Sequence, residues 1–213
     1  LTRPYLSVVQ DGEIFNFDDM VNYIFEEYFS PEDEEESGDE WKITIENVTF
    51  EDGHLVYVDK EIDQCWDLSA MNLYAEEFFM DNKMSPIDAE LIINNVAPVK
   101  GLLLFNYDTF EFDFQGTMED FDLADTYKYW TPYLNITSVN GIAYADAHIV
   151  GDVDDIWAMD ISGDFDIRDG VILGPDGSNL LSAKSITGNA KNINIEYESY
   201  IFNTLYINDY STH

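Results

Sequence analysis

The chain has 213 residues, of which 44 are acidic and 9 are basic, so its formal net charge is -35 at pH 7. A charge this negative excludes a nucleic-acid backbone or a bare anionic membrane surface as the main partner, because both would be repelled. Hydrophobic residues make up 46% of the chain, which is enough for one sizeable core, and no linker divides it. We therefore expect one β-rich domain over residues 1–213, without an internal disulfide because Cys65 is the single cysteine.

The first quarter of the chain predicts a strand, a helix and a loop in that order. Tyr5 to Val9 has the pattern of a strand. Phe17 to Phe29 carries apolar residues at three- and four-residue spacing behind Asn16, a favourable N-cap, and predicts a helix. Residues 30–40 are dense in Asp and Glu, and like charges at this density favour a solvated acidic loop.

Most of the remaining chain alternates apolar and polar residues with a period of two, which predicts strands with one buried face. The pattern is clearest in five runs: Trp41 to Ile45, Ile87 to Ile93, Phe110 to Phe114, Trp157 to Ile167 and Ile193 to Tyr197. Dipeptides typical of tight turns separate the runs and indicate an antiparallel meander: Asp52-Gly53, Asn140-Gly141, Asp169-Gly170 and Asp176-Gly177. One short helix, Leu123 to Tyr133, is predicted between the strands.

A loose internal repeat is visible in the two helix-to-strand regions. Asn47 to Gly53 aligns without a gap with Asn135 to Gly141, and each follows one of the predicted helices. We therefore expect a mainly β fold with two short helices: a curved antiparallel sheet built from a duplicated helix-strand-turn-strand unit, with halves at about residues 5–115 and 116–213.

Signatures of catalysis are missing from the sequence. It has no glycine-rich phosphate loop, no Gly-x-Ser-x-Gly elbow, no His-Glu-x-x-His and no Cys-x-x-Cys. His54, His148 and His213 are far apart, and the aspartates from Asp152 to Asp164 lack the spacing of a calcium loop. We expect a protein that is not an enzyme and uses neither a cofactor nor a metal.

The segment from Ile43 to Asp59, Ile-Thr-Ile-Glu-Asn-Val-Thr-Phe-Glu-Asp-Gly-His-Leu-Val-Tyr-Val-Asp, resembles the AsmA-like proteins of Gram-negative bacteria. In that family a strand typically ends in a Gly turn followed by hydrophobic, aromatic and Asp positions, here Gly53, Tyr57 and Asp59. The stretches Trp130 to Gly151 and Ile161 to Gly170 repeat the theme.

The resemblance implies a periplasmic protein that is anchored to the inner membrane, is related to bridge-like lipid-transfer proteins and acts in outer-membrane biogenesis. The chain has no run of roughly 20 apolar residues, no initiating Met and no signal-peptide pattern. We therefore expect a segment excised from a longer protein, with its membrane association through a part outside this chain.

The leading hypothesis is that the apolar face of the sheet forms a groove for phospholipid or another acyl-chain lipid. Two short helices can cover only part of so large a sheet, so some apolar surface is left for a partner or a ligand. The predicted groove residues are Leu91, Ile93, Phe110, Phe112, Phe114, Trp157, Met159 and Ile161. The alternatives are an interaction or scaffolding module with a closed β core and, third, a carbohydrate-active or carbohydrate-binding protein.

Overall fold

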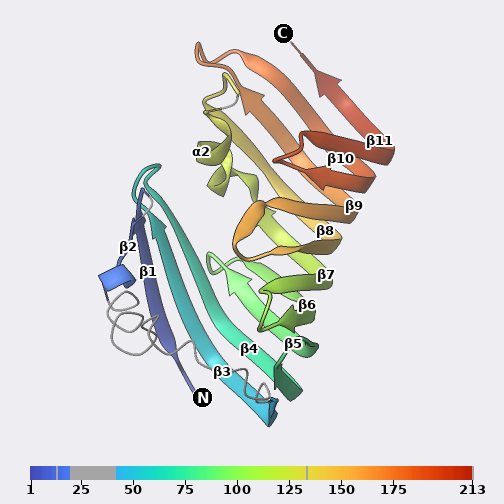
Figure 1. Ribbon diagram of the computed structural model, residues 1–213. Helices are drawn as coiled ribbons and strands as arrows, with labels where there is room; N and C mark the ends of the chain where they lie inside the picture. Colours follow the sequence, from blue (N-terminus) through green and yellow to red (C-terminus); the bar gives the residue numbers. More distant parts are fainter. Residues whose placement is uncertain (13, 20–41, 133, 213) are drawn as a thin grey trace.

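The computed structural model describes residues 1–12, 14–19, 42–132 and 134–212, without the side chain of Trp157. Within these residues eleven strands form one curved, open sheet in the order β11-β10-β9-β8-β7-β6-β5-β4-β3-β1-β2 (Figure 1). The elements are β1 (Tyr5–Asp11), β2 (Ile14–Phe15), β3 (Ile43–Asp59), β4 (Gln64–Met80), β5 (Met84–Ile93), β6 (Ala97–Asn106), β7 (Glu111–Asp122), the 3₁₀ turn η2 (Leu123–Asp125), α2 (Tyr127–Trp130), β8 (Ser138–Asp152), β9 (Asp155–Leu173), β10 (Asn179–Asn194) and β11 (Ser199–Ser211).

The prediction of a mainly β, curved sheet is confirmed. From β3 to β11 each strand pairs antiparallel with the next one along the chain, as a meander requires. The exception is β1, which pairs parallel with β3 from Tyr5 opposite His54 to Gln10 opposite Asp59. A parallel pair needs a crossover of a dozen residues or more, and the long connection over residues 16–42 supplies that length.

Three of the four predicted turns are wrong. Asp52-Gly53, Asn140-Gly141 and Asp169-Gly170 lie inside β3, β8 and β9, and only Asp176-Gly177 connects two strands, β9 and β10. The pairing register shifts near the first two, and Asp52 and Asp169 have φ of 54° and 51°. Asp, Asn and Gly adopt positive φ easily, and a β-bulge uses that property as readily as a hairpin turn does.

The second predicted helix is present but shorter than expected. The segment from Leu123 to Tyr133 forms η2 and then the single turn α2, with Thr126 between them. Asp122 caps the first turn, because its Oδ1 accepts a hydrogen bond of 2.9 Å from the Ala124 amide. Of the other helix, Phe17 to Phe29, all but the first residues lie outside the described residues, as does the acidic loop at 30–40.

The expected duplication is not confirmed. The strand after the first helical region, β3, pairs parallel with β1, which is separated from it in the chain by β2 and that region. The strand after η2 and α2, β8, pairs antiparallel with the strand that precedes it, β7. Asn47 to Gly53 lies within β3, whereas Asn135 to Thr137 precedes β8, so the aligned motifs occupy different places in the two halves.

On the apolar face, residues of similar size form rows that run across neighbouring strands. Directly opposed residues of paired strands share a face, so the pairing register shows which residues belong to each row. One row consists of small residues only and crosses six strands from β5 to β10: Ala89, Gly101, Gly116, Ala147, Gly163 and Ala190. The adjacent row contains large residues: Ile87, Leu103, Phe114, Ile149 and Ile161. A row without bulky side chains lets neighbouring strands approach and the sheet bend, as glycine kinks do in curved sheets.

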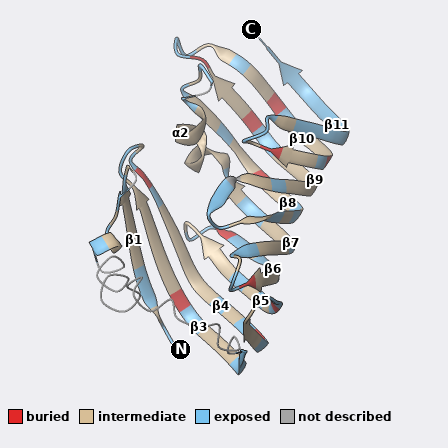
Figure 2. Ribbon diagram, viewed as in Figure 1, coloured by how far each residue is buried: buried red, intermediate tan, exposed pale blue. Residues whose placement is uncertain are grey.

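The sheet has no closed core among the described residues. The buried apolar side chains there are all alanines: Ala75, Ala97, Ala143, Ala183 and Ala190. Figure 2 shows the same result, with most strand residues in the intermediate class on a single layer of strands. A sheet of this length with large apolar side chains left half-buried therefore has an apolar surface available for a ligand or partner.

Candidate functional site: an apolar trough

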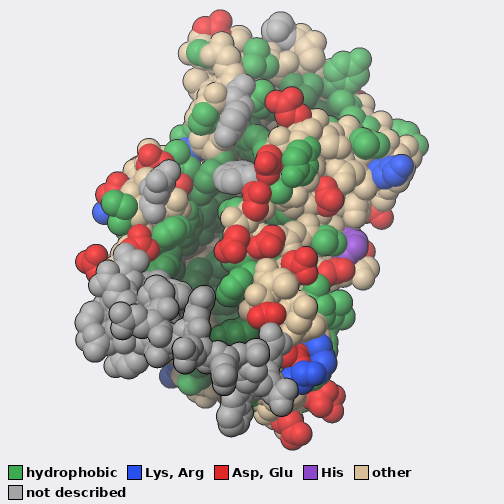
Figure 3. Space-filling view, viewed as in Figure 1, with side chains coloured by type: hydrophobic (Ala, Val, Ile, Leu, Met, Phe, Trp, Pro, Cys, Tyr) green, Lys and Arg blue, Asp and Glu red, His purple; other side chains and the backbone are tan. Residues whose placement is uncertain are grey.

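The sheet curls toward its apolar face. Trp66 of β4 and Phe121 of β7 stack with ring centroids 6.0 Å apart, although β5 and β6 lie between their strands. In a flat sheet these strands would be about 14 Å apart, at roughly 4.8 Å for each neighbour. The two walls therefore fold over β5 and β6, and the concave side between them is a trough. Figure 3 shows this hollow lined by hydrophobic side chains, with acidic residues along its margin.

A cavity of about 300 Å³ lies in the trough. This volume is at the lower end of the range of small-molecule pockets, roughly 300–1,000 Å³. Strands β3 to β6 contribute its lining, and every lining residue is apolar: Val48, Phe50, Leu73, Ala75, Phe78, Ile87, Leu103 and Phe105. Among the residues that the structure describes, no polar side chain lines the cavity, so their side chains offer contact to hydrocarbon and no hydrogen bond.

The structure places most of the predicted groove residues on the concave face. Leu91, Ile93, Phe112, Phe114 and Ile161 are in register with other residues of that face. Met159 lies on the same face. Gly151 is paired with Phe112, and a Cβ added to Gly151 would lie only 2.8 Å from the Met159 Cβ. These six side chains are half-buried, so they remain accessible to a ligand in the trough.

Two predicted residues need correction or fall outside the description. Phe110 was expected to alternate with Phe112 on one strand, but it precedes β7 in a loop with φ of 57°. Its ring is tilted against Phe105 and Tyr107 at 6.3 and 6.4 Å, at the end of the trough rather than along it. Trp157 lies in β9, but its side chain is outside the described residues.

None of the seven predicted residues with a described side chain lines the cavity itself. Its lining comes from strands that the site prediction passed over, chiefly β3, β4 and β6. The signal was present as period-two apolar pairs at Val48 and Phe50, Leu73 and Ala75, and Leu103 and Phe105. Which of many such pairs face one another depends on register between strands, and this is not visible in a single run of residues.

One end of the trough is closed by η2 and α2. Tyr129 of α2 stacks on Trp66 at 6.4 Å and accepts a 2.9 Å hydrogen bond from its indole Nε1. Asn94, in the turn between β5 and β6, donates from Nδ2 to Asp125 of η2 at 2.6 Å. Lys128 of α2 donates to the carbonyl oxygen of Asp63, at the tip of the β3–β4 hairpin. The segment is thus held to the floor and to the β3–β4 wall by these side-chain contacts.

Burial acts on the hydroxyl groups at the closed end. Desolvation, reinforced by the nearby Asp59, raises the pKa of Tyr57, which also donates a hydrogen bond to Gln10 Oε1. Desolvation also raises the pKa of Tyr129, although the hydrogen bond from Trp66 opposes the shift. Both phenol groups therefore stay neutral at physiological pH and add no negative charge to this end of the trough.

The convex face carries most of the charged side chains of the paired strands, and its described histidines form cross-strand pairs. His54 Nε2 lies 3.0 Å from Asp67 Oδ1, and His148 Nε2 lies 2.8 Å from Asp113 Oδ1. Hydrogen bonds from Asn194 and Asn192 hold the pKa of the Asp160 carboxyl below its usual range. In the part of the chain that the structure describes, no group of three or more His, Cys, Asp or Glu residues is arranged to hold a metal ion.

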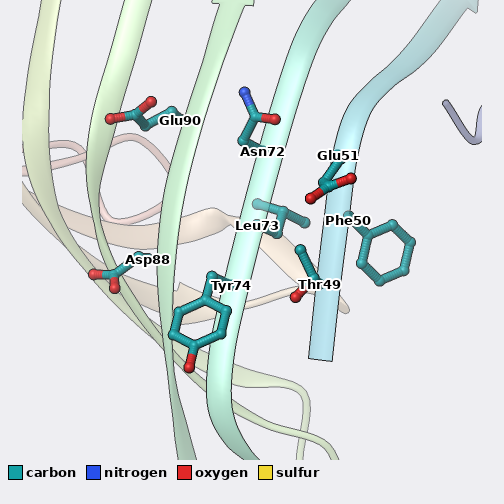
Figure 4. Close-up of a pocket in the computed structure, with 8 residues that line it drawn as sticks. All are labelled: Thr49, Phe50, Glu51, Asn72, Leu73, Tyr74, Asp88 and Glu90. Atoms are coloured by element: carbon teal, nitrogen blue, oxygen red, sulfur yellow. The ribbon is translucent and has the colours of Figure 1, made fainter. Parts of the chain in front are cut away.

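A shallow depression of about 320 Å³ lies over β3, β4 and β5. Figure 4 shows Asp88 and Glu90 together on one strand and Glu51 on β3, with Asn72 and Tyr74 between them. Asn72 is occupied locally: its Oδ1 accepts from the Asp52 amide and its Nδ2 donates to the Ala70 carbonyl. The depression therefore consists of spaced carboxylates beside a bulge that Asn72 holds, with the exposed Tyr74 paired with Asp88 across the strands.

Comparisons with known proteins add no family to this geometry. Neither protein-family models nor curated proteins nor solved structures gave a match to the chain. None of the helices in the described ranges is long and apolar enough to span a membrane. The functional argument therefore rests on the trough itself.

Proposed function

We propose that the apolar trough binds the acyl chain of a phospholipid or a related lipid, and that the protein is a non-enzymatic lipid-handling segment of an AsmA-like protein. The observation that carries the proposal is a cavity of about 300 Å³ with only apolar lining residues on the concave side of an open sheet. Hydrocarbon is the ligand chemistry that such a lining favours, because it gains from removal of apolar surface and requires no polar partner.

The distribution of charge supports the same proposal. Acidic residues are on the convex face and along the margin, as Asp88, Asp113 and Asp164 are, so the outside of the sheet stays hydrated while the inside stays apolar. The AsmA-like resemblance of Ile43 to Asp59 extends the proposal to the periplasm, to outer-membrane biogenesis and to a membrane anchor outside this chain.

A matched pair of substitutions on β6 tests the proposal. Leu103 lines the cavity, whereas its neighbour Leu102 points to the opposite face, is 43% exposed and pairs with Asp88. Leu103→Gln and Leu102→Gln change the same side chain in the same strand on opposite faces. Burial of one Leu is worth about 1.5–3 kcal/mol, so we expect Leu103→Gln to reduce bound lipid at least tenfold and Leu102→Gln to leave it unchanged.

The measurement is solvent extraction and mass spectrometry of lipid from detergent-free protein made in Gram-negative cells, with circular dichroism as the check on folding. Lipid in the wild type and in Leu102→Gln, and its loss in folded Leu103→Gln, supports the trough. Absence of lipid from every preparation, together with no uptake from phospholipid vesicles, would reject lipid handling in favour of a scaffolding module.

A further inference from the structure

We infer that η2 and α2 form an end wall which makes the trough a pocket for one acyl chain and limits the chain length that it accepts. The inference rests on the proposed function and adds a direction and a length limit to it. Trp66 is the residue against which the methyl end of the chain would stop.

The first argument is that the wall crosses the whole trough. Trp66 contacts Phe121 of the facing wall and Tyr129 of α2, so three aromatic rings from β4, β7 and α2 meet at one point. Polar contacts fix the same segment from below and from the side, through Asn94 to Asp125 and Lys128 to Asp63. All eight residues from Leu123 to Trp130 are half-buried, which shows that both short elements lie against other parts of the protein.

The second argument concerns which end of a lipid the wall can meet. The indole N–H of Trp66 is engaged with the Tyr129 hydroxyl, and the aromatic faces around it are apolar. A charged headgroup buried against these rings would lose its hydration, and the cation of the wall, Lys128, is already engaged with Asp63. The methyl end of an acyl chain has no such cost, so the chain lies with its headgroup toward the other end, near Phe78 and Phe105.

The floor of the trough sets the scale of the length limit. Strand β5 runs the length of the floor, from Met84 to Ile93, and its ten residues span about 30 Å. Within that span each added methylene that reaches apolar surface tightens binding by up to about fourfold. Once the methyl group reaches Trp66, further methylenes stay in water and the gain stops.

The test measures binding of saturated fatty acids of increasing length, from octanoic to cerotic acid, to the full chain. For the wild type we expect affinity to rise with length and then level off. The double variant Trp66→Ala with Tyr129→Ala removes two of the three rings. In this variant we expect the affinity to keep rising to longer fatty acids before it levels off. Tyr206→Ala, at a 61% exposed tyrosine on the distant edge strand β11, is the control and should behave as the wild type does.

A second readout needs no disruption of the wall. Palmitic acid brominated at its methyl end should quench the fluorescence of Trp66 more than palmitic acid brominated beside the carboxyl group. The Trp66 signal is taken as the difference between the wild type and Trp66→Phe. Equal quenching by the two probes, with affinity that keeps rising with length, would overturn the end wall and leave the lipid trough standing. Failure of every fatty acid to bind the wild type would instead overturn the proposed function and this inference with it.

Discussion

The row of small residues across the sheet predicts how sensitive the fold is to a single methyl group. A Cβ at Gly116 would lie 2.4 Å from the Lys100 carbonyl oxygen, 2.5 Å from the Phe114 Cζ and 3.0 Å from the Gly101 Cα. Ordinary contacts of a Cβ are 3.4 Å or longer. Two of these three neighbours are backbone atoms of the adjacent strand, so Gly116→Ala can be accommodated only if β6 and β7 move apart.

The cost follows from the overlap. Overpacking in a filled site costs about 1–3 kcal/mol, and sites where backbone must move are at the upper end. We therefore expect Gly116→Ala to lower the free energy of unfolding by about 3 kcal/mol. With a urea m-value of about 2 kcal/mol/M, the midpoint of unfolding should fall by about 1.5 M.

Gly170→Ala is the matched control, because it adds the same methyl group to the same sheet. A Cβ at Gly170 would lie 3.6 Å from the Ile167 Cγ2 and the Ile186 Cδ1, which is ordinary contact. Since alanine also restricts the unfolded chain, this variant should be neutral or more stable by about 0.4–1 kcal/mol. The assay is urea unfolding followed by circular dichroism. Equal midpoints for the two variants would show that close strand approach at the small row does not shape the sheet.

Two further predictions concern single side chains. Ser85 is 0% exposed, and its hydroxyl oxygen accepts a 2.8 Å hydrogen bond from the Phe79 amide. Ser85→Ala should therefore lower the free energy of unfolding in urea by about 1–3 kcal/mol. The control, Ser162→Ala on the convex face, should lower it by less than about 0.5 kcal/mol, the usual limit for surface changes. The raised pKa of Tyr57 stabilises the fold fully below the unfolded pKa of about 10, and this contribution is lost as the pH rises through the higher folded value. Stability should therefore fall less between neutral pH and about pH 10.5 in Tyr57→Phe than in the wild type; an equal fall in both proteins would contradict the prediction.

Local pattern was sufficient for the fold class. Alternation with a period of two, as in Ile87 to Ile93, predicts a strand because side chains in a strand point to opposite faces in turn. The same alternation separates acidic from apolar residues, and this predicts the polar convex face and the apolar concave one. The short helical segment behind Asp122 was also predictable, since an Asp N-cap is a local feature.

What the sequence could not provide is the pairing between strands. Asp52-Gly53 fits a hairpin turn and a bulge equally well, and only the partner strand decides between them. The cavity depends on Phe50, Leu73 and Leu103 meeting on one face, although they are far apart in the chain. The six-strand row of small residues, including Gly101 and Gly116, is likewise visible only after the register is known.

Curvature and an open interior need to coexist in this protein, and the structure shows how they do. A sheet with one apolar face ordinarily covers it with a second layer, but here the small row lets the sheet bend so that its own strands face one another. If the bend continued along the whole trough, the walls would meet and close it. They meet at Trp66 and Phe121, where Tyr129 lies against them, while a cavity of about 300 Å³ remains farther along. The separation of the walls is therefore fixed where α2 is held, so under the proposed lipid function α2 and η2 would limit how much hydrocarbon the trough accepts.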